Sequence, residues 1–92
     1  MKYVLLGTLS ADWAAKQGKR VESAKARLSQ LGISLEAVYY TQGQYDFVDV
    51  VDVPEPEDLL TFSVWYVSQG YGHIQSMPAF DEDTLARAAS KA

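Results

Sequence analysis

The sequence predicts one α+β domain, residues 1–92, with strands and helices in the order βαββαβ and a short helix at the end. Three observations predict this fold. Short runs rich in Val, Leu, Ile and Tyr alternate with two segments whose apolar residues recur at helical spacing. Glycine or proline stands at nearly every junction between these segments. The length is that of one domain.

The first third of the chain predicts a strand, a short turn and a helix. The strand is expected at Lys2–Leu9, after which Ser10 could cap a helical turn that Gly18 ends. A helix is expected over residues 19–31 because apolar side chains recur there every three or four residues. That apolar stripe consists of Val21, Ala24, Leu28 and Leu31.

The middle of the chain predicts a β-hairpin. Its strands are expected at Ser34–Gln42 and Tyr45–Val53, joined by the two-residue turn Gly43-Gln44. A glycine in the first position fits a type II′ turn. Pro54 ends the second strand, because proline cannot continue a central ladder.

The last third predicts a second helix at Pro56–Gln69, a fourth strand at His73–Phe80, and a final helix at Glu82–Ser90 that Asp81 caps. The buried side of the second helix is expected to consist of Leu59, Phe62, Val64, Trp65 and Val67. Both crossovers contain a helix and should be right-handed. The result is a ferredoxin-like, four-stranded antiparallel sheet with its helices on one face.

Both faces of this sheet are expected to be apolar. In the first strand, Val4 and Leu6 point one way, whereas Leu5 and Leu9 point the other. Two helices cover one face only, and a soluble monomer rarely exposes so large an apolar surface. The terminal helix is too short to cover the second face. A second copy packing sheet to sheet is therefore expected, which gives a homodimer or a higher homo-oligomer.

Composition excludes several kinds of chemistry. The chain has no cysteine, so thiolate metal sites, disulfides and thiol nucleophiles are absent. A net charge of −4 disfavours nucleic acid as a partner. No apolar stretch approaches the ~20 residues of a membrane span, and no secretory signal opens the chain. We expect a cytoplasmic protein without a cofactor, a metal or a membrane partner. The basic cluster is interpreted as a solvated helix face or, alternatively, as an anion site, and consists of Lys16, Lys19, Arg20, Lys25 and Arg27.

The hairpin carries a motif that resembles a known family. Gly43, Tyr45 and Asp46 stand where the GYD family has its glycine, aromatic residue and aspartate. Other matching positions are Gly7, Arg20, Leu31, Gly32, Ala79 and Phe80. The resemblance covers nearly the whole chain and implies a dimeric α+β barrel with little agreed function. Departures from the family pattern at Asp49, His73 and Gln75 put any relative's ligand in doubt.

The same turn is also similar to one in the effector-binding domain of leucine-responsive bacterial regulators, which bind amino acids at subunit interfaces. No helix-turn-helix precedes the domain here, so a role in transcription does not carry over. Gly43 and Asp46 are first expected to serve the turn itself, through positive φ and backbone hydrogen bonds. Ligand binding by these two residues is the alternative. Tyr45 may equally pack on a cross-strand neighbour.

Asp49 is the most informative polar residue, because it interrupts an apolar strand. If its face meets a partner sheet, burial should raise the pKa of its carboxyl. His73 and Gln75 are candidate partners if they share that face. His73 is the only histidine, and nothing converges on it as a metal site would require. Trp13 is interpreted as a lid on the core or, alternatively, as part of a ligand pocket.

Two functions remain open. One is a small-molecule-binding or assembly module, in which Gly43, Tyr45, Asp46, Gln75 and Trp13 are the candidate ligand contacts. The other is a cofactor-independent, monooxygenase- or isomerase-like enzyme with Asp49 and His73 as its acid/base pair. A closed pocket of about 300 Å³ or more holding both side chains would favour the enzyme, and a filled core would favour the module.

Overall fold

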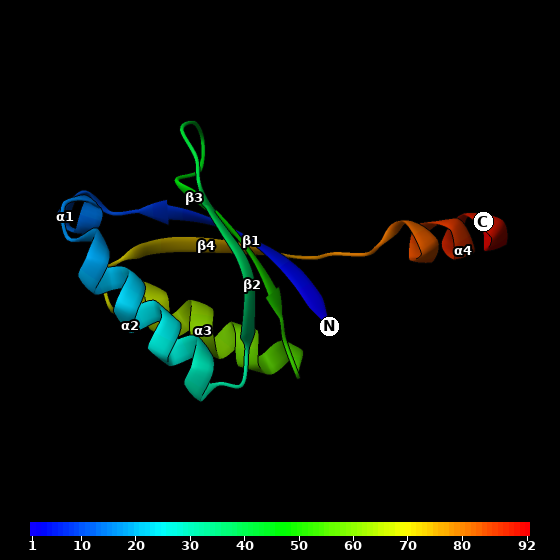
Figure 1. The fold of residues 1–92 in the computed structure, drawn as a ribbon, viewed down its shortest axis with the longest axis horizontal. Coiled ribbons are helices and arrows are strands. Elements are labelled where there is room, and N and C mark those ends of the chain that lie inside the picture. The colour runs from blue at the N-terminus through cyan, green and yellow to red at the C-terminus, as the bar shows by residue number, and fades with distance from the viewer.

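The fold was taken from a computed structural model that describes residues 1–92, and it confirms the predicted α+β class. The strands are β1 (Lys2–Leu9), β2 (Ser34–Tyr40), β3 (Phe47–Asp52) and β4 (Gly72–Pro78). The helices are α1 (Ala11–Ala14), α2 (Gln17–Gln30), α3 (Pro56–Ser68) and α4 (Glu82–Lys91). The strands form one antiparallel sheet in the order β2-β3-β1-β4. Helices α2 and α3 cover one face, as in the ferredoxin-like fold (Figure 1). No helix combines the length and apolarity needed to cross a membrane.

The predicted two-residue hairpin turn is wrong. Strand β2 ends at Tyr40 and β3 begins at Phe47, so residues 41–46 form a longer loop. The reason lies in Asp46, whose N–H donates to the carbonyl of Gly7 at 2.8 Å and whose carboxylate accepts the N–H of Leu9 at 2.7 Å. Asp46 is thereby bound to β1, and the loop closes through Thr41, whose N–H donates to the Asp46 carbonyl at 2.9 Å and whose hydroxyl donates to the Tyr45 carbonyl at 2.7 Å.

The first helical region also differs from the prediction. Helix α2 begins at Gln17, so Gly18 lies in its first turn and does not end the preceding helix. Ser10 holds the N-cap position of α1 without a side-chain cap. Its hydroxyl instead donates to the carbonyl of Gly70 at 2.8 Å, which ties the end of β1 to the loop before β4.

The core lies between the sheet and the two helices. The completely or nearly buried side chains are Leu5, Leu28, Ile33, Phe47, Val51, Val53, Leu59, Phe62, Tyr66 and Tyr71. The buried side of α3 differs from the prediction, since Tyr66 belongs to it whereas Val64 and Val67 are exposed. Leu59, Phe62 and Tyr66 follow the spacing i, i+3, i+7, which keeps them on one face of a helix.

The outer face of the sheet carries no helix (Figure 1). Its side chains alternate with those of the core, because neighbouring residues of a strand point to opposite faces. Val4, Leu6, Val48 and Val50 line its centre, and Tyr39 and Met77 are exposed near its edges. The prediction that both faces are apolar is therefore confirmed.

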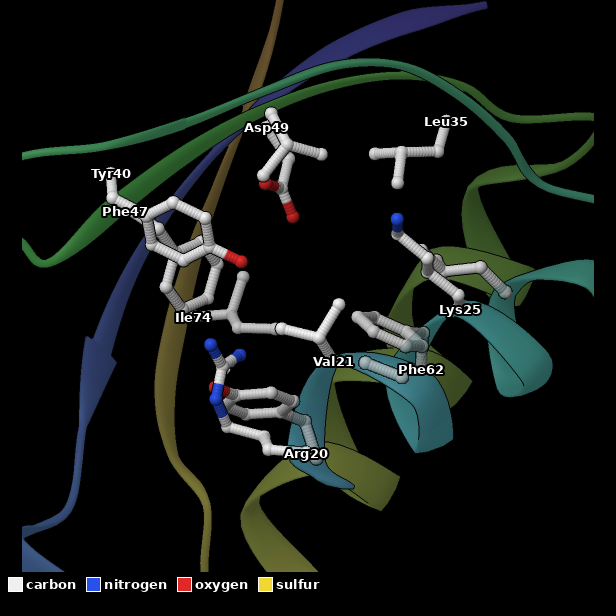
Figure 2. A pocket seen from close by; sticks show the side chains of 13 residues that line it. Arg20, Val21, Lys25, Leu35, Tyr40, Phe47, Asp49, Phe62 and Ile74 are labelled. Atoms are coloured by element: carbon white, nitrogen blue, oxygen red, sulfur yellow. Dashed lines mark hydrogen bonds between the residues drawn. The ribbon is translucent and has the colours of Figure 1, made fainter. Parts of the chain in front are cut away.

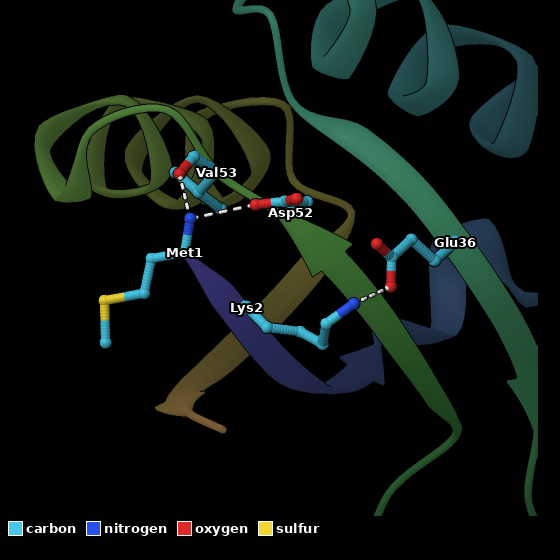
Figure 3. Close-up of polar contacts among 5 residues, drawn as sticks. All are labelled: Met1, Lys2, Glu36, Asp52 and Val53. Carbon is cyan, nitrogen blue, oxygen red and sulfur yellow. Dashed lines mark hydrogen bonds and ion pairs between the residues drawn. The ribbon is translucent and has the colours of Figure 1, made fainter. Parts of the chain in front are cut away.

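Polar contacts frame one end of this outer face (Figure 3). The amino group of Met1 donates to the Asp52 carboxylate at 2.9 Å and to the carbonyl of Val53 at 2.8 Å. Lys2 forms an ion pair with Glu36 at 2.5 Å, bridging β1 to β2 across β3. Exposed pairs of this kind contribute little to stability, so their role is to fix the ends of the strands.

Candidate functional site

A small cavity lies between the inner face of the sheet and helices α2 and α3 (Figure 2). Ten of its thirteen lining residues are hydrophobic, and the charged ones are Arg20, Lys25 and Asp49. The free space is about 30 Å³, which is room for roughly one or two water molecules. The exposed side chains of Lys25 and Tyr40 belong to its wall, so the cavity opens between α2 and the edge strand β2.

Asp49 points into this cavity from the middle of the sheet (Figure 2). It pairs with Leu5 on one side and Val38 on the other, and shares the inner face with Phe47 and Val51. The side chain therefore faces the helices and not a partner sheet. It is 9% exposed, and its Oδ1 atom has no hydrogen-bond partner.

Burial raises the pKa of the Asp49 carboxyl from 3.8 to about 6, while the charges of Arg20 and Lys25 act in the opposite direction. Desolvation disfavours the charged carboxylate, and two cations at a distance offset only part of that penalty. The carboxyl can thus change its protonation state near neutral pH.

Arg20 enters the same cavity from the first half of α2 (Figure 2). It is only 3% exposed. Its Nη1 donates to the hydroxyl of Tyr66 at 3.3 Å, and its guanidinium lies 5.3 Å from the centre of the Phe47 ring. Its Nε and Nη2 atoms are buried without a partner. Burial raises the pKa of Tyr66, and the charge of Arg20 opposes that shift.

The interpretation of Arg20 as part of a solvated basic face is wrong. Arg20, Ala24 and Leu28 recur at intervals of four residues, so the arginine continues the apolar stripe of α2 toward its N-terminus. That spacing was the signal in the sequence that could have identified it. Of the other cations of the cluster, Lys16, Lys19 and Lys25 are exposed as expected, whereas Arg27 is half-buried.

Arg20 and Asp49 do not neutralise each other. No nitrogen of the guanidinium lies within 4.0 Å of the carboxylate, and the chain's only ion pairs are those of Met1 and Lys2. Buried polar groups in folded proteins nearly always have partners. Two opposite charges therefore enter one apolar cavity, and each has polar atoms that are buried without a partner.

The candidate acid/base pair is not brought together. His73 lies on β4 opposite Thr8, and Asp49 lies opposite Leu5, three positions further along β1. Ile74 lines the inner cavity, so His73 beside it faces outward. Gln75 shares the outer face with His73. The pocket holding both side chains that would have favoured this enzyme is absent, because the two residues occupy opposite faces of one sheet.

The hairpin residues separate into different roles. Tyr45 reaches across the outer face, where its hydroxyl donates to Oε1 of Gln75 at 2.7 Å. Asp46 is engaged by β1 through backbone bonds, in keeping with its structural interpretation. Gly43 has a φ of +154° at an exposed position with no neighbouring atom within 4 Å of an added Cβ.

Trp13 is half-buried over one end of the core. Its ring meets that of Tyr71 edge to face, with the centroids 4.5 Å apart. Lys16 lies 5.3 Å from the indole centre on the solvent side. This packing agrees with a lid on the core, and Trp13 does not line the inner cavity.

Comparison with known proteins supports the architecture. The model of a family described as the GYD domain matches residues 3–89. The chain is similar in structure to the 5-chloro-2-hydroxyhydroquinone dehydrochlorinase of Burkholderia phenoliruptrix, solved in complex with 2,5-dihydroxybenzoquinone. The TM-score is 0.65 at 8% identity, over 91% of this chain and 98% of that one. A hypothetical protein of Pyrococcus horikoshii gives a TM-score of 0.53 at 20% identity, over 88% and 90% of the two chains. The curated proteins gave no match.

Proposed function

This chain belongs to the GYD domain family. We propose that it is a cytoplasmic homo-oligomer that binds a small organic molecule in the cavity between Arg20 and Asp49. One observation carries the proposal. Two nearly buried, oppositely charged side chains enter one apolar cavity without meeting, and both keep unused hydrogen-bonding atoms. Leaving such atoms unpaired costs about 1–3 kcal/mol each.

The chemistry of the cavity indicates the class of ligand. Arg20 offers N–H donors suited to a carboxylate or an acidic hydroxyl group. Asp49 can accept from a second hydroxyl or amine, and the lining between them is apolar. A small, largely apolar molecule with polar groups at two ends fits these requirements. The dehydrochlorinase with the same fold was solved with a dihydroxybenzoquinone, a small planar ring with oxygen groups on opposite sides.

Such a ligand exceeds the free space of about 30 Å³, so its entry requires the cavity to widen. The wall that can yield is the one formed by the exposed Lys25 and Tyr40 side chains. Tyr40 lies at the end of the edge strand β2, where its side chain is about half exposed. We propose that binding displaces Tyr40 outward.

The binding proposal can be tested with 2,5-dihydroxybenzoquinone as the probe, using isothermal titration calorimetry. Native mass spectrometry of the freshly purified protein would look in parallel for a retained molecule. Arg20→Gln should lose binding, and Arg27→Gln is the matched control, since Arg27 lies on the same helix but outside the cavity. A retained or added molecule bound equally by both variants would contradict the site.

The homo-oligomer is supported by the uncovered apolar face. Light scattering on a sizing column should give a mass of about twice 10.2 kDa or a higher multiple. Val48→Lys on the outer face should shift the mass to that of a monomer. The control is Val64→Lys, the same change on the exposed side of α3, which should leave the mass unchanged. A folded wild-type monomer at micromolar concentration would contradict the proposal.

A catalytic role of the same cavity is a second candidate, favoured by the Asp49 pKa of about 6. A carboxylate of that pKa can act as a general base near neutral pH. Arg20 and the Tyr66 hydroxyl could then stabilise negative charge on the substrate. His73 has no part in this version. Turnover of a molecule identified by native mass spectrometry should rise with pH through about 6 and disappear in Asp49→Asn.

A further inference from the structure

The C-terminal arm, residues 79–92, stands apart from the rest of the molecule. Helix α4 makes no substantial contact with any other element, and Figure 1 shows it at the far end from α1 and α2. The arm makes the molecule 48 Å long. It also raises the radius of gyration to 14.4 Å, against about 12 Å for a compact chain of this length.

The arm nevertheless has the features of a helix that packs on something. Asp81 caps it by accepting the N–H of Thr84 at 2.8 Å, and acidic residues fill its first turn. Leu85, Ala88 and Ala89 lie on one side at helical spacing. Phe80 and Leu85 are 68% and 67% exposed. A helix of ten residues is not stable alone in water, so this side requires a partner surface.

The place where the arm leaves the sheet indicates which surface it packs against. Ala79 still donates to the carbonyl of Lys2 at 2.9 Å, so the chain leaves the sheet only after that residue. Met77, two residues earlier, belongs to the uncovered outer face. The arm therefore extends this face beyond the sheet, and whatever covers the face also meets the arm.

Charge distinguishes between the two simplest ways of stacking two copies. If the copies run in the same direction, the acidic turns formed by Asp81, Glu82 and Asp83 face each other. If they run in opposite directions, each acidic turn meets the α1–α2 end of the other copy, where Lys16 and Lys19 are exposed beside Asp12 and Glu22, and Lys25 follows further along α2. Contact between two purely acidic turns is unfavourable, whereas an end that also offers lysines can pair with them, so the second arrangement is preferred.

We infer that the arm of each copy packs against the α1–α2 end of a second copy of this chain. This inference rests on the proposed homo-oligomer and adds a reciprocal exchange of arms, as a two-fold symmetric interface requires. Phe80 and Leu85 make the apolar contact, and the acidic turn determines the direction in which the two copies stack.

Zero-length carboxylate–amine cross-linking of a mixture of ¹⁴N- and ¹⁵N-labelled protein tests the contact directly. The expected products join residues 81–83 of one label to Lys16, Lys19 or Lys25 of the other. Products that join only α4 to α4, or only residues of one label, would overturn the inference if light scattering shows an oligomer. A wild-type monomer in light scattering would overturn the homo-oligomer itself.

Two variants of the full chain provide an independent measurement. Leu85→Glu should raise the dissociation constant of the oligomer by roughly a hundredfold to ten-thousandfold, because a reciprocal exchange loses one buried leucine from each of the two arms. Ser90→Glu adds the same charge on the opposite side of α4 and should change it less than threefold. Amide hydrogens of α4 should be protected from exchange in the wild type but not in Leu85→Glu. Equal dissociation constants for the two variants, in a wild type that is oligomeric, would overturn the inference while leaving the homo-oligomer standing.

Discussion

The two faces of the sheet have nearly the same composition but different surroundings. Leu5 and Leu6 are neighbours on β1, yet Leu5 is completely buried under the helices whereas Leu6 lies on the uncovered side. The inner face also contains a buried aspartate, Asp49, with the buried Arg20 of α2 facing it across the cavity, and the outer face is almost purely apolar at its centre. Alternation along a strand therefore shows that two faces exist but not which one is the interior of the subunit. The inner face is where a ligand could bind, and the outer face has the character of an interface between copies.

The largest expected effect separates these two faces directly. Leu5→Ala should reduce the free energy of unfolding by about 2–5 kcal/mol, because it leaves a cavity in a filled core. Leu6→Ala should cost less, and its cost should grow with protein concentration if the outer face is covered by a second copy. Urea unfolding at several concentrations measures both. Equal, concentration-independent losses would show that the two faces do not differ in the way proposed.

A second prediction concerns the carboxylate of the inner face. Since the Asp49 pKa is about 6 in the folded chain and 3.8 in the unfolded one, folding favours the protonated form. The stability contribution is complete below about pH 4, falls as the pH rises to about 6, and is constant above that. The loss is on the order of 3 kcal/mol. Asp49→Asn should remove this dependence of stability on pH. The control is Asp46→Asn, which changes a carboxylate outside the cavity. A wild-type stability that rises across this range would contradict the burial of Asp49.

The sequence predicted most of the fold but little of the site. Strand β1 was predicted to the residue, and the helices to within one or two residues except for the end of α1, because their periodicity is regular. The hairpin was predicted but its turn was not, since the bonds from Asp46 to Gly7 and Leu9 join residues far apart in the sequence. Asp49 and His73 were paired as acid and base only because both are polar. Whether their side chains point to the same face of the sheet depends on the register between the strands, which the sequence does not give.

A third prediction compares two glycines. Gly7 lies directly under the Phe47 ring, and an added Cβ would be 1.9 Å from a ring carbon. Gly7→Ala should therefore displace Phe47 from the wall of the cavity and cost about 1–3 kcal/mol, as overpacking does. Gly43→Ala meets no atom and should cost no more than about 1 kcal/mol, owing to its positive φ alone. Thermal unfolding measures both, and a larger loss at Gly43 would show that its loop is more tightly packed than described.

The smallest effect tests whether the outer face becomes an interior when two copies meet. Tyr45 donates to Gln75 across this face, and the bond is exposed in the isolated chain. If the face stays in water, Tyr45→Phe should cost no more than about 0.5–1.5 kcal/mol, because water replaces the lost partner. If a second copy covers the face, Gln75 would be left buried without a partner and the cost should rise to about 1–3 kcal/mol.

Tyr39→Phe is the control, since Tyr39 is more exposed and makes no side-chain hydrogen bond. Measuring both variants below and above the dissociation constant of the oligomer decides between the cases. A cost at Tyr45 that increases on association, with none at Tyr39, identifies the outer face as a second interior, whereas a cost independent of concentration means that this part of the face stays in contact with water.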